Sequence, residues 1–125
     1  MFSLLINILT IKFIFNNYTN KKYLILENLN SDILIKYLGK KNTEIISLRS
    51  EINFFLILKL IFKLKRLNQI NYYLESINQV KPQKIITNID SNINFYKLKK
   101  YYPRKIFISI QNGVRIDNIF RNEKN

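Results

Sequence analysis

Four short apolar runs, each followed by a polar cluster, constrain the fold of this chain more than any other feature. The runs are KYLIL, TEIISL, KIITNI and KIFISI, at residues 22–26, 43–48, 84–89 and 105–110. Apolar runs of this length are typical of strands that are buried on both faces of a parallel sheet. Segments with helical spacing separate the runs, so we expect an α/β fold: a Rossmann-like parallel sheet of about four strands with right-handed crossovers and covering helices.

The segments between the runs carry signals for the start and the end of helices. Asn30 or Ser31 predicts a cap, Asp32 favours the first turn, and Gly39 predicts an end in the left-handed conformation. Later helices are expected at 70–80, where Lys81-Pro82 stops the pattern, and after a cap at Ser91. The apolar side of the first predicted helix consists of Ile33, Leu34, Tyr37 and Leu38.

The longest apolar segment, Ile52 to Leu67, predicts one amphipathic helix. Its cations Lys59, Lys63 and Arg66 have the spacing of a single stripe along a helix face. The remaining face is apolar, which fits either packing on the sheet or a position in a membrane interface. We expect packing, because both faces of an α/β sheet need covering helices.

Two apolar runs, at 1–15 and 54–62, are too short to span a membrane, and Lys12 and Lys59 interrupt them. The first run also lacks the features of a signal peptide. We therefore expect an apolar helical segment at 1–20 followed by one partial Rossmann-like domain at 21–125. The expected location is the cytoplasm, with peripheral contact at the inner face of the cell membrane as an alternative.

The charge of the chain raises two further function classes. A net charge of +13 attracts nucleic acids and anionic lipids, and eight tyrosines are available for base stacking. The basic residues are spread along the chain, which argues against nucleic acid as a partner and fits the isoleucine, lysine and asparagine bias of A/T-rich coding. Cysteine and histidine are absent, so thiolate, imidazole and most zinc chemistry is excluded. We expect no metal and no cofactor, and the catalytic residues are unassigned.

Polar side chains follow every predicted strand. Ligands of open parallel sheets bind beyond the carboxyl ends of the strands, so these clusters are the candidate site. Glu27 follows the first strand, and the segments after the third and fourth strands read TNIDSN and QNGVR. Gly113 permits a positive φ, Arg115 can hold a phosphate or a carboxylate, and Asp90 can bind a hydroxyl or cap a helix. The predicted substrate-binding residues are Thr87, Asp90, Asn92, Gln111, Asn112, Gly113 and Arg115.

These same residues carry a resemblance to a known family. The passage YYLESINQVKPQKIITNIDSNINFYKLKKYYPRKIFISIQNGVR resembles the N-terminal part of bacterial surface carbohydrate biosynthesis proteins, which are related to lipopolysaccharide O-antigen and capsule assembly and similar to GT-B glycosyltransferases. The matching pieces are KP before a strand, an IT..D.N..FY segment and a strand that ends in IQNG.R. Together with KKYLILENLNSDILIKYL, the resemblance covers about residues 20–118.

The resemblance implies two Rossmann-like domains around a cleft, the first handling a sugar or lipid-linked acceptor and the second a nucleotide-sugar donor. It places the predicted site residues in that cleft. The 125 residues hold only an incomplete half of such a fold, so we expect a separately encoded C-terminal domain as a partner and no sugar transfer by this chain alone. Whether the chain is an enzyme stays open, and a small basic nucleic-acid-binding protein or a peripheral membrane protein remains as an alternative.

Overall fold

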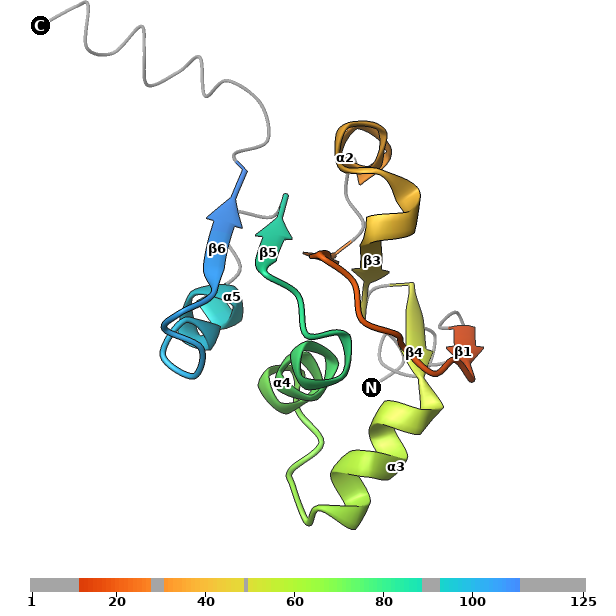
Figure 1. The fold of residues 1–125 in the computed structure, drawn as a ribbon. Helices are drawn as coiled ribbons and strands as arrows, with labels where there is room; N and C mark the ends of the chain where they lie inside the picture. Colours follow the sequence, from red (N-terminus) through yellow and green to blue (C-terminus); the bar gives the residue numbers. More distant parts are fainter. Residues whose placement is uncertain (1–11, 28–30, 49, 89–92, 111–125) are drawn as a thin grey trace, which may run out of the picture.

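The computed structural model describes residues 12–27, 31–48, 50–88 and 93–110 of the chain, and four of its strands form a parallel sheet (Figure 1). The order of the strands across the sheet is β3-β2-β5-β6. The predicted parallel α/β layout is thereby confirmed, and each strand lies within its predicted apolar run. The strands are β2 (Tyr23–Leu26), β3 (Thr43–Ile46), β5 (Lys84–Thr87) and β6 (Ile106–Ser109).

The register aligns the ends of all four strands. Tyr23 pairs with Thr43 on one side and with Lys84 on the other, and the ladder runs without offset to Leu26. On the other side of β5, Lys84 pairs with Ile106 of β6. The polar residues that follow the strands therefore share one edge of the sheet, called here the carboxyl edge, and those that precede the strands share the amino edge.

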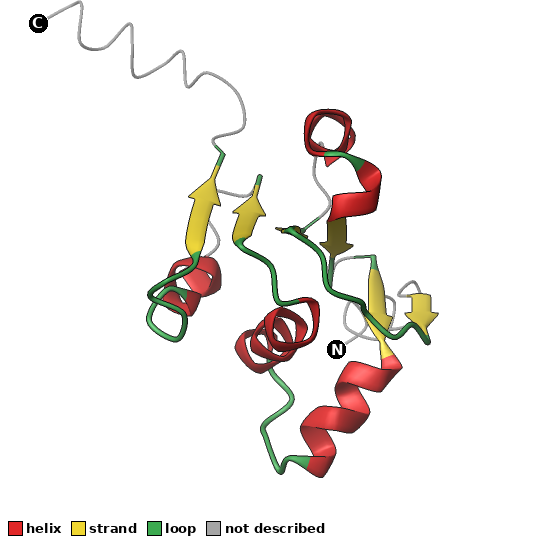
Figure 2. Ribbon diagram, viewed as in Figure 1, coloured by secondary structure: helices red, strands yellow, loops and turns green. Residues whose placement is uncertain are grey.

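Helices cover both faces of this sheet (Figures 1 and 2). The helices α4 (Gln69–Val80) and α5 (Ile93–Leu98) contact each other on one face, and α2 (Ser31–Leu38) lies on the other. As predicted, α4 ends before Lys81, which adopts the left-handed conformation of a helix C-cap, and Gly39 follows α2 with a φ of 89°. Of the predicted caps, Ser31 is the first residue of α2, and Asn30 and Ser91 lie outside the described residues.

The core lies between the sheet and the α4–α5 face. Strand side chains interdigitate there with apolar side chains of the helices, and the largest fully buried ones are Tyr73 and Phe95. The predicted apolar side of α2 is less buried than expected, because Ile33 is 63% and Tyr37 84% exposed. The main described neighbour of α2 is the short 3₁₀ helix η1 (Lys40–Asn42), which does not cover that side.

Two predictions for the segments that flank the first two core strands need correction. Of the apolar helical segment expected at 1–20, residues 1–11 lie outside the described residues, and residues 12–20 form the strand β1 (Lys12–Ile14) and then irregular backbone in place of a helix. The predicted continuous helix at 52–67 is instead a strand, β4 (Glu51–Asn53), followed by the shorter helix α3 (Phe54–Phe62). The strands β1 and β4 pair in parallel as a separate two-stranded sheet.

Asn53 explains why the helix starts late. Its side chain caps α3 by accepting a hydrogen bond from the backbone N–H of Phe55 at 3.0 Å, and its amide nitrogen donates to the Asn16 carbonyl at 2.7 Å. After α3, Lys63 is the C-cap, and it forms an ion pair with Glu75 at 2.8 Å. Arg66 therefore lies beyond the helix, and the predicted three-cation stripe does not form along it.

None of the described helices combines the length and the apolar character that spanning a lipid bilayer requires.

Candidate functional site

A buried carboxylate lies at the carboxyl edge, directly after β2. Glu27 is almost completely buried. Its φ is 72°, in the left-handed region that residues other than glycine rarely adopt. Its Oε2 accepts a hydrogen bond from the Ser47 hydroxyl at 3.0 Å, and its Oε1 accepts one from the backbone N–H of Leu48 at 3.3 Å. The Tyr73 hydroxyl also donates to Oε1. Three donors therefore satisfy a group that burial alone would disfavour.

The contacts of Glu27 extend into a network that joins the sheet to two helices. Tyr73 belongs to α4, and its hydroxyl accepts a hydrogen bond from Gln69 Nε2 at 2.9 Å. The Asn94 side chain of α5 donates to Gln69 Oε1. Residues that follow β2 and β3 are thus linked through the start of α4 to the start of α5, which holds the carboxyl edge in a defined shape.

Thr87 is the one predicted site residue that lies among the described residues. It is the last residue of β5, it is fully buried, and its hydroxyl donates to the Leu26 carbonyl at 3.0 Å. This bond joins the ends of the two central strands. The other predicted site residues lie outside the described residues, so the structure does not test whether they meet: Asp90, Asn92, Gln111, Asn112, Gly113 and Arg115.

The ends of β2 and β5 form the topological switch point of the sheet. From β2 the chain passes to β3 on one side, and after β3 it returns to the other side of β2 to form β5. In open α/β sheets ligands bind at this position, because the connections leave in opposite directions and open a crevice. Glu27, which follows β2, and Thr87, which ends β5, are therefore placed to shape such a crevice.

The polar groups of Glu27, Ser47 and Thr87 at this edge are buried and hydrogen-bonded within the protein. They can fix the shape of the edge, and contact with a hydroxyl-rich ligand through hydrogen bonds is left to the residues of the loops that follow the strands. Another hydrogen bond between side chains lies at the end of β6, where the Tyr96 hydroxyl donates to Ser109 Oγ at 3.1 Å. Among the described residues, no group of three or more acidic side chains is arranged to hold a metal ion.

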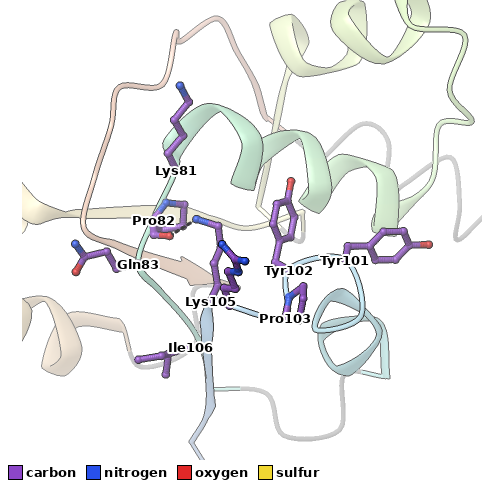
Figure 3. A pocket seen from close by; sticks show the side chains of 9 residues that line it. Lys81, Pro82, Gln83, Tyr101, Tyr102, Pro103, Lys105 and Ile106 are labelled. Carbon is purple, nitrogen blue, oxygen red and sulfur yellow. Dashed lines mark hydrogen bonds between the residues drawn. The ribbon is translucent and has the colours of Figure 1, made fainter.

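A pocket lies at the amino edge, on the opposite side of the strands from Glu27 (Figure 3). Its volume is about 620 Å³, within the usual range for small-molecule sites. Two segments line it, the one that precedes β5 and the one that precedes β6. The lining residues are Lys81, Pro82, Gln83, Tyr101, Tyr102, Pro103, Arg104, Lys105 and Ile106.

The lining of this pocket includes three cations and no acidic side chain. The Lys105 ammonium donates to the Pro82 carbonyl at 2.5 Å and lies 5.7 Å from the centre of the Tyr102 ring. Burial lowers the pKa of Lys105, and burial also raises the pKa of Tyr102. The pocket therefore combines positive charge with aromatic surface, a combination suited to an anion that carries a planar ring.

The sequence predicted part of this arrangement and missed part of it. The polar character of the carboxyl edge follows from the residues after each strand, Glu27 included. The partners of Glu27 on β3 and α4 have no signal in the sequence, because Ser47 and Tyr73 lie far along the chain. The sequence signal for the amino-edge pocket is the pair of segments KPQ and YYPRK, which stand immediately before two predicted strands and combine cations, prolines and tyrosines.

A comparison of the chain with protein-family models, with curated proteins and with solved structures finds no significant match.

Proposed function

We propose that this chain is the N-terminal part of a glycosyltransferase-like protein of bacterial surface carbohydrate biosynthesis, and that it binds the sugar acceptor. The observation that carries the proposal is the hydrogen-bonded polar edge at the switch point of the parallel sheet, centred on Glu27. A parallel sheet with the strand order β3-β2-β5-β6 is the kind of scaffold that the resemblance implies for a first Rossmann-like domain. The polar edge supplies groups that suit sugar hydroxyls.

Within this proposal, the described and the predicted residues have different roles. Glu27 and Thr87 are positioning residues, because their polar atoms bond to neighbouring strands and helices. Contact with the acceptor is assigned to the residues of the following loops. Asp90 and Asn92 follow β5, and Gln111, Asn112, Gly113 and Arg115 follow β6.

We further propose that sugar transfer requires a donor-binding domain that these 125 residues do not include. A GT-B arrangement holds the donor in a second Rossmann-like domain, so an acceptor half alone lacks the nucleotide-sugar. The proposed setting is the cytoplasmic side of the cell membrane, where a lipid-linked acceptor meets the nucleotide-sugar pool. Appreciable turnover of UDP-glucose by the purified chain would contradict this division of roles.

Acceptor binding is tested by saturation-transfer NMR with hexoses, N-acetylhexosamines and UDP-glucose. We expect saturation transfer to a free sugar, and we expect Asp90→Asn and Arg115→Gln to weaken it. The matched control is Lys40→Gln, which removes an exposed charge from η1, before β3 at the amino edge. No transfer to any sugar, or equal loss in the control, would count against the proposal.

The amino-edge pocket favours a second candidate function, the binding of single-stranded nucleic acid. Arg104, Lys105 and Tyr101 provide cations and an aromatic side chain in one pocket, which is how such proteins contact phosphates and stack bases. Binding of this kind weakens steeply as salt is added, because phosphate neutralisation releases counterions. Binding of a fluorescent oligonucleotide that is indifferent to salt would exclude this function.

A further inference from the structure

The connection between α3 and α4 exposes an unusual number of large apolar side chains. They lie at the last turn of α3 and in the segment after it, and we call them the apolar tip: Ile61 (50% exposed), Phe62 (82%), Leu64 (94%) and Leu67 (57%). Isolated exposed apolar residues are normal on protein surfaces, but a contiguous group of this size marks a contact surface.

Leu64 has a backbone conformation that a leucine rarely adopts. Its φ is 55°, in the left-handed region where glycine and asparagine are preferred. Its backbone N–H donates to the Ile61 carbonyl at 3.0 Å, so this conformation closes the end of α3. The Leu64 side chain is almost fully exposed and does not contribute to the described core. The side chain therefore adds no buried area to the described fold and is available for contact with another surface.

Cations surround the apolar tip. Lys59 lies on α3, and Lys65 and Arg66 lie between Leu64 and Leu67, all three exposed. Lys63 is paired with Glu75, at 2.8 Å, and no other acidic residue lies between 52 and 75. The tip is thus apolar at its end and positively charged around it, the pattern of segments that insert into anionic bilayer surfaces.

The shape and the charge of the molecule decide between a bilayer and a second copy of the chain. The α3–α4 connection projects at the end of the helix pair, away from the four-stranded sheet (Figure 1). A projecting tip can enter a soft interface without a matching groove. Two copies meeting at their tips would bring Lys65 and Arg66 of each together, and each chain carries a net charge of +13.

We infer that the apolar tip inserts into the surface of an anionic lipid bilayer. The apolar side chains enter the acyl boundary, and Lys59, Lys65 and Arg66 lie at the level of the lipid phosphates. This contact differs from the one expected of a three-cation helix stripe, because it uses the end of α3 and the following turn. It does not depend on the proposed sugar function.

The first experiment is flotation of the full chain with two kinds of vesicle, phosphatidylcholine alone and phosphatidylcholine mixed with phosphatidylglycerol. We expect flotation with the mixed vesicles, and weaker flotation with phosphatidylcholine alone. The double variant Phe62→Ser/Leu64→Asn should bind mixed vesicles at least about tenfold more weakly, since two large apolar side chains no longer leave water. Asparagine tolerates the backbone of residue 64, so this variant should keep its fold.

The matched control is Ile33→Asn/Tyr37→Ser, which removes two comparably exposed apolar side chains from α2. It should float like the original chain. Lys65→Gln/Arg66→Gln should lose most of the preference for phosphatidylglycerol, whereas Lys40→Gln/Lys41→Gln, with the same charge change on η1, should lose less.

A fluorescence measurement tests insertion independently of affinity. The chain contains no tryptophan, so Phe62→Trp introduces a single reporter at the tip. Mixed vesicles should shift its emission to the blue and allow brominated lipids to quench it, whereas Tyr37→Trp should show neither effect. The inference is overturned by an unshifted emission of the Phe62→Trp variant, by no flotation on mixed vesicles, or by flotation that the tip variant leaves unchanged. Self-association that the tip variant abolishes, without vesicle binding, would overturn it as well.

Discussion

The two edges of the parallel sheet differ in how their polar groups are satisfied. At the carboxyl edge, Glu27 is buried and accepts hydrogen bonds from Ser47, Leu48 and Tyr73. At the amino edge, the pocket has three cations and no acid in its lining. The first edge uses its polar groups to hold its own structure, and the second leaves its charge available to a ligand. Substitutions of Glu27 and its hydrogen-bond partners should therefore lower stability, whereas substitutions in the amino-edge pocket should change binding and leave stability nearly unchanged.

The largest expected effect is that of Glu27→Ala. The substitution leaves the hydroxyls of Ser47 and Tyr73 and the backbone N–H of Leu48 without their acceptor. We therefore expect a loss of about 3–5 kcal/mol in the free energy of unfolding. Chemical denaturation measures it. A loss below about 1 kcal/mol, as expected for an exposed carboxylate, would show that the network does not hold this edge.

Tyr73→Phe isolates one link of the same network. It removes the hydroxyl that donates to Glu27 and accepts from Gln69, while the buried ring stays in place. We expect a loss of about 1–3 kcal/mol, because partners of the hydroxyl remain buried. A double-mutant cycle of Tyr73→Phe with Glu27→Gln, measured by denaturation, should show that the two changes in the free energy of unfolding are not additive. Additive changes would show that the two side chains do not stabilise each other.

Arg104→Gln sharpens the comparison from the other edge. We expect a change in stability within about 0.5 kcal/mol, because the side chain is exposed. Binding of a single-stranded oligonucleotide should nevertheless weaken severalfold and lose part of its salt dependence. Arg66→Gln, an exposed arginine outside the pocket, is the matched control for fluorescence anisotropy. If both substitutions weakened oligonucleotide binding equally, binding would depend on the overall positive charge of the chain and not on the pocket.

The smallest effect is expected for Glu44→Gln. Burial raises the pKa of Glu44, which lies on the edge strand β3, above its usual value. A raised carboxyl pKa in the folded state means that folding disfavours the charged form, so stability falls as the pH rises through the window between the unfolded and folded pKa values. Glu44→Gln should therefore raise the Tm slightly at neutral pH, and the gain should disappear below about pH 4. A Tm that falls at neutral pH would contradict the sign.

The strands and the main helices could be predicted because their signals are local. Apolar runs marked β2 and β5, and Lys81-Pro82 marked the end of α4. The break at Asn53 was missed because an asparagine inside an apolar segment fits either a helix or a cap, and only its bonds to Asn16 and Phe55 decide for the cap. Apolar spacing also overestimated the burial of Tyr37, since spacing identifies a face without showing what covers it.

The candidate site was predictable only where topology determines it. A parallel order brings the ends of the strands to one edge, so Thr87 and Glu27 were expected there. The pairing of Glu27 with Tyr73 joins residues 46 positions apart, and the choice of partner depends on how α4 packs. The amino-edge pocket depends in the same way on the meeting of two loops.

The most direct test of the central claim, that the carboxyl edge binds the hydroxyl-rich ligand, is amide chemical-shift mapping of the isotope-labelled chain during titration with N-acetylhexosamines. The account predicts the largest shifts for Asp90, Asn92 and Asn112, with smaller shifts for Asn88 and Leu48 at the same edge, and with the amides of Lys81, Gln83 and Lys105 unchanged. Shifts confined to the amino edge, or no shifts at either edge, would contradict it.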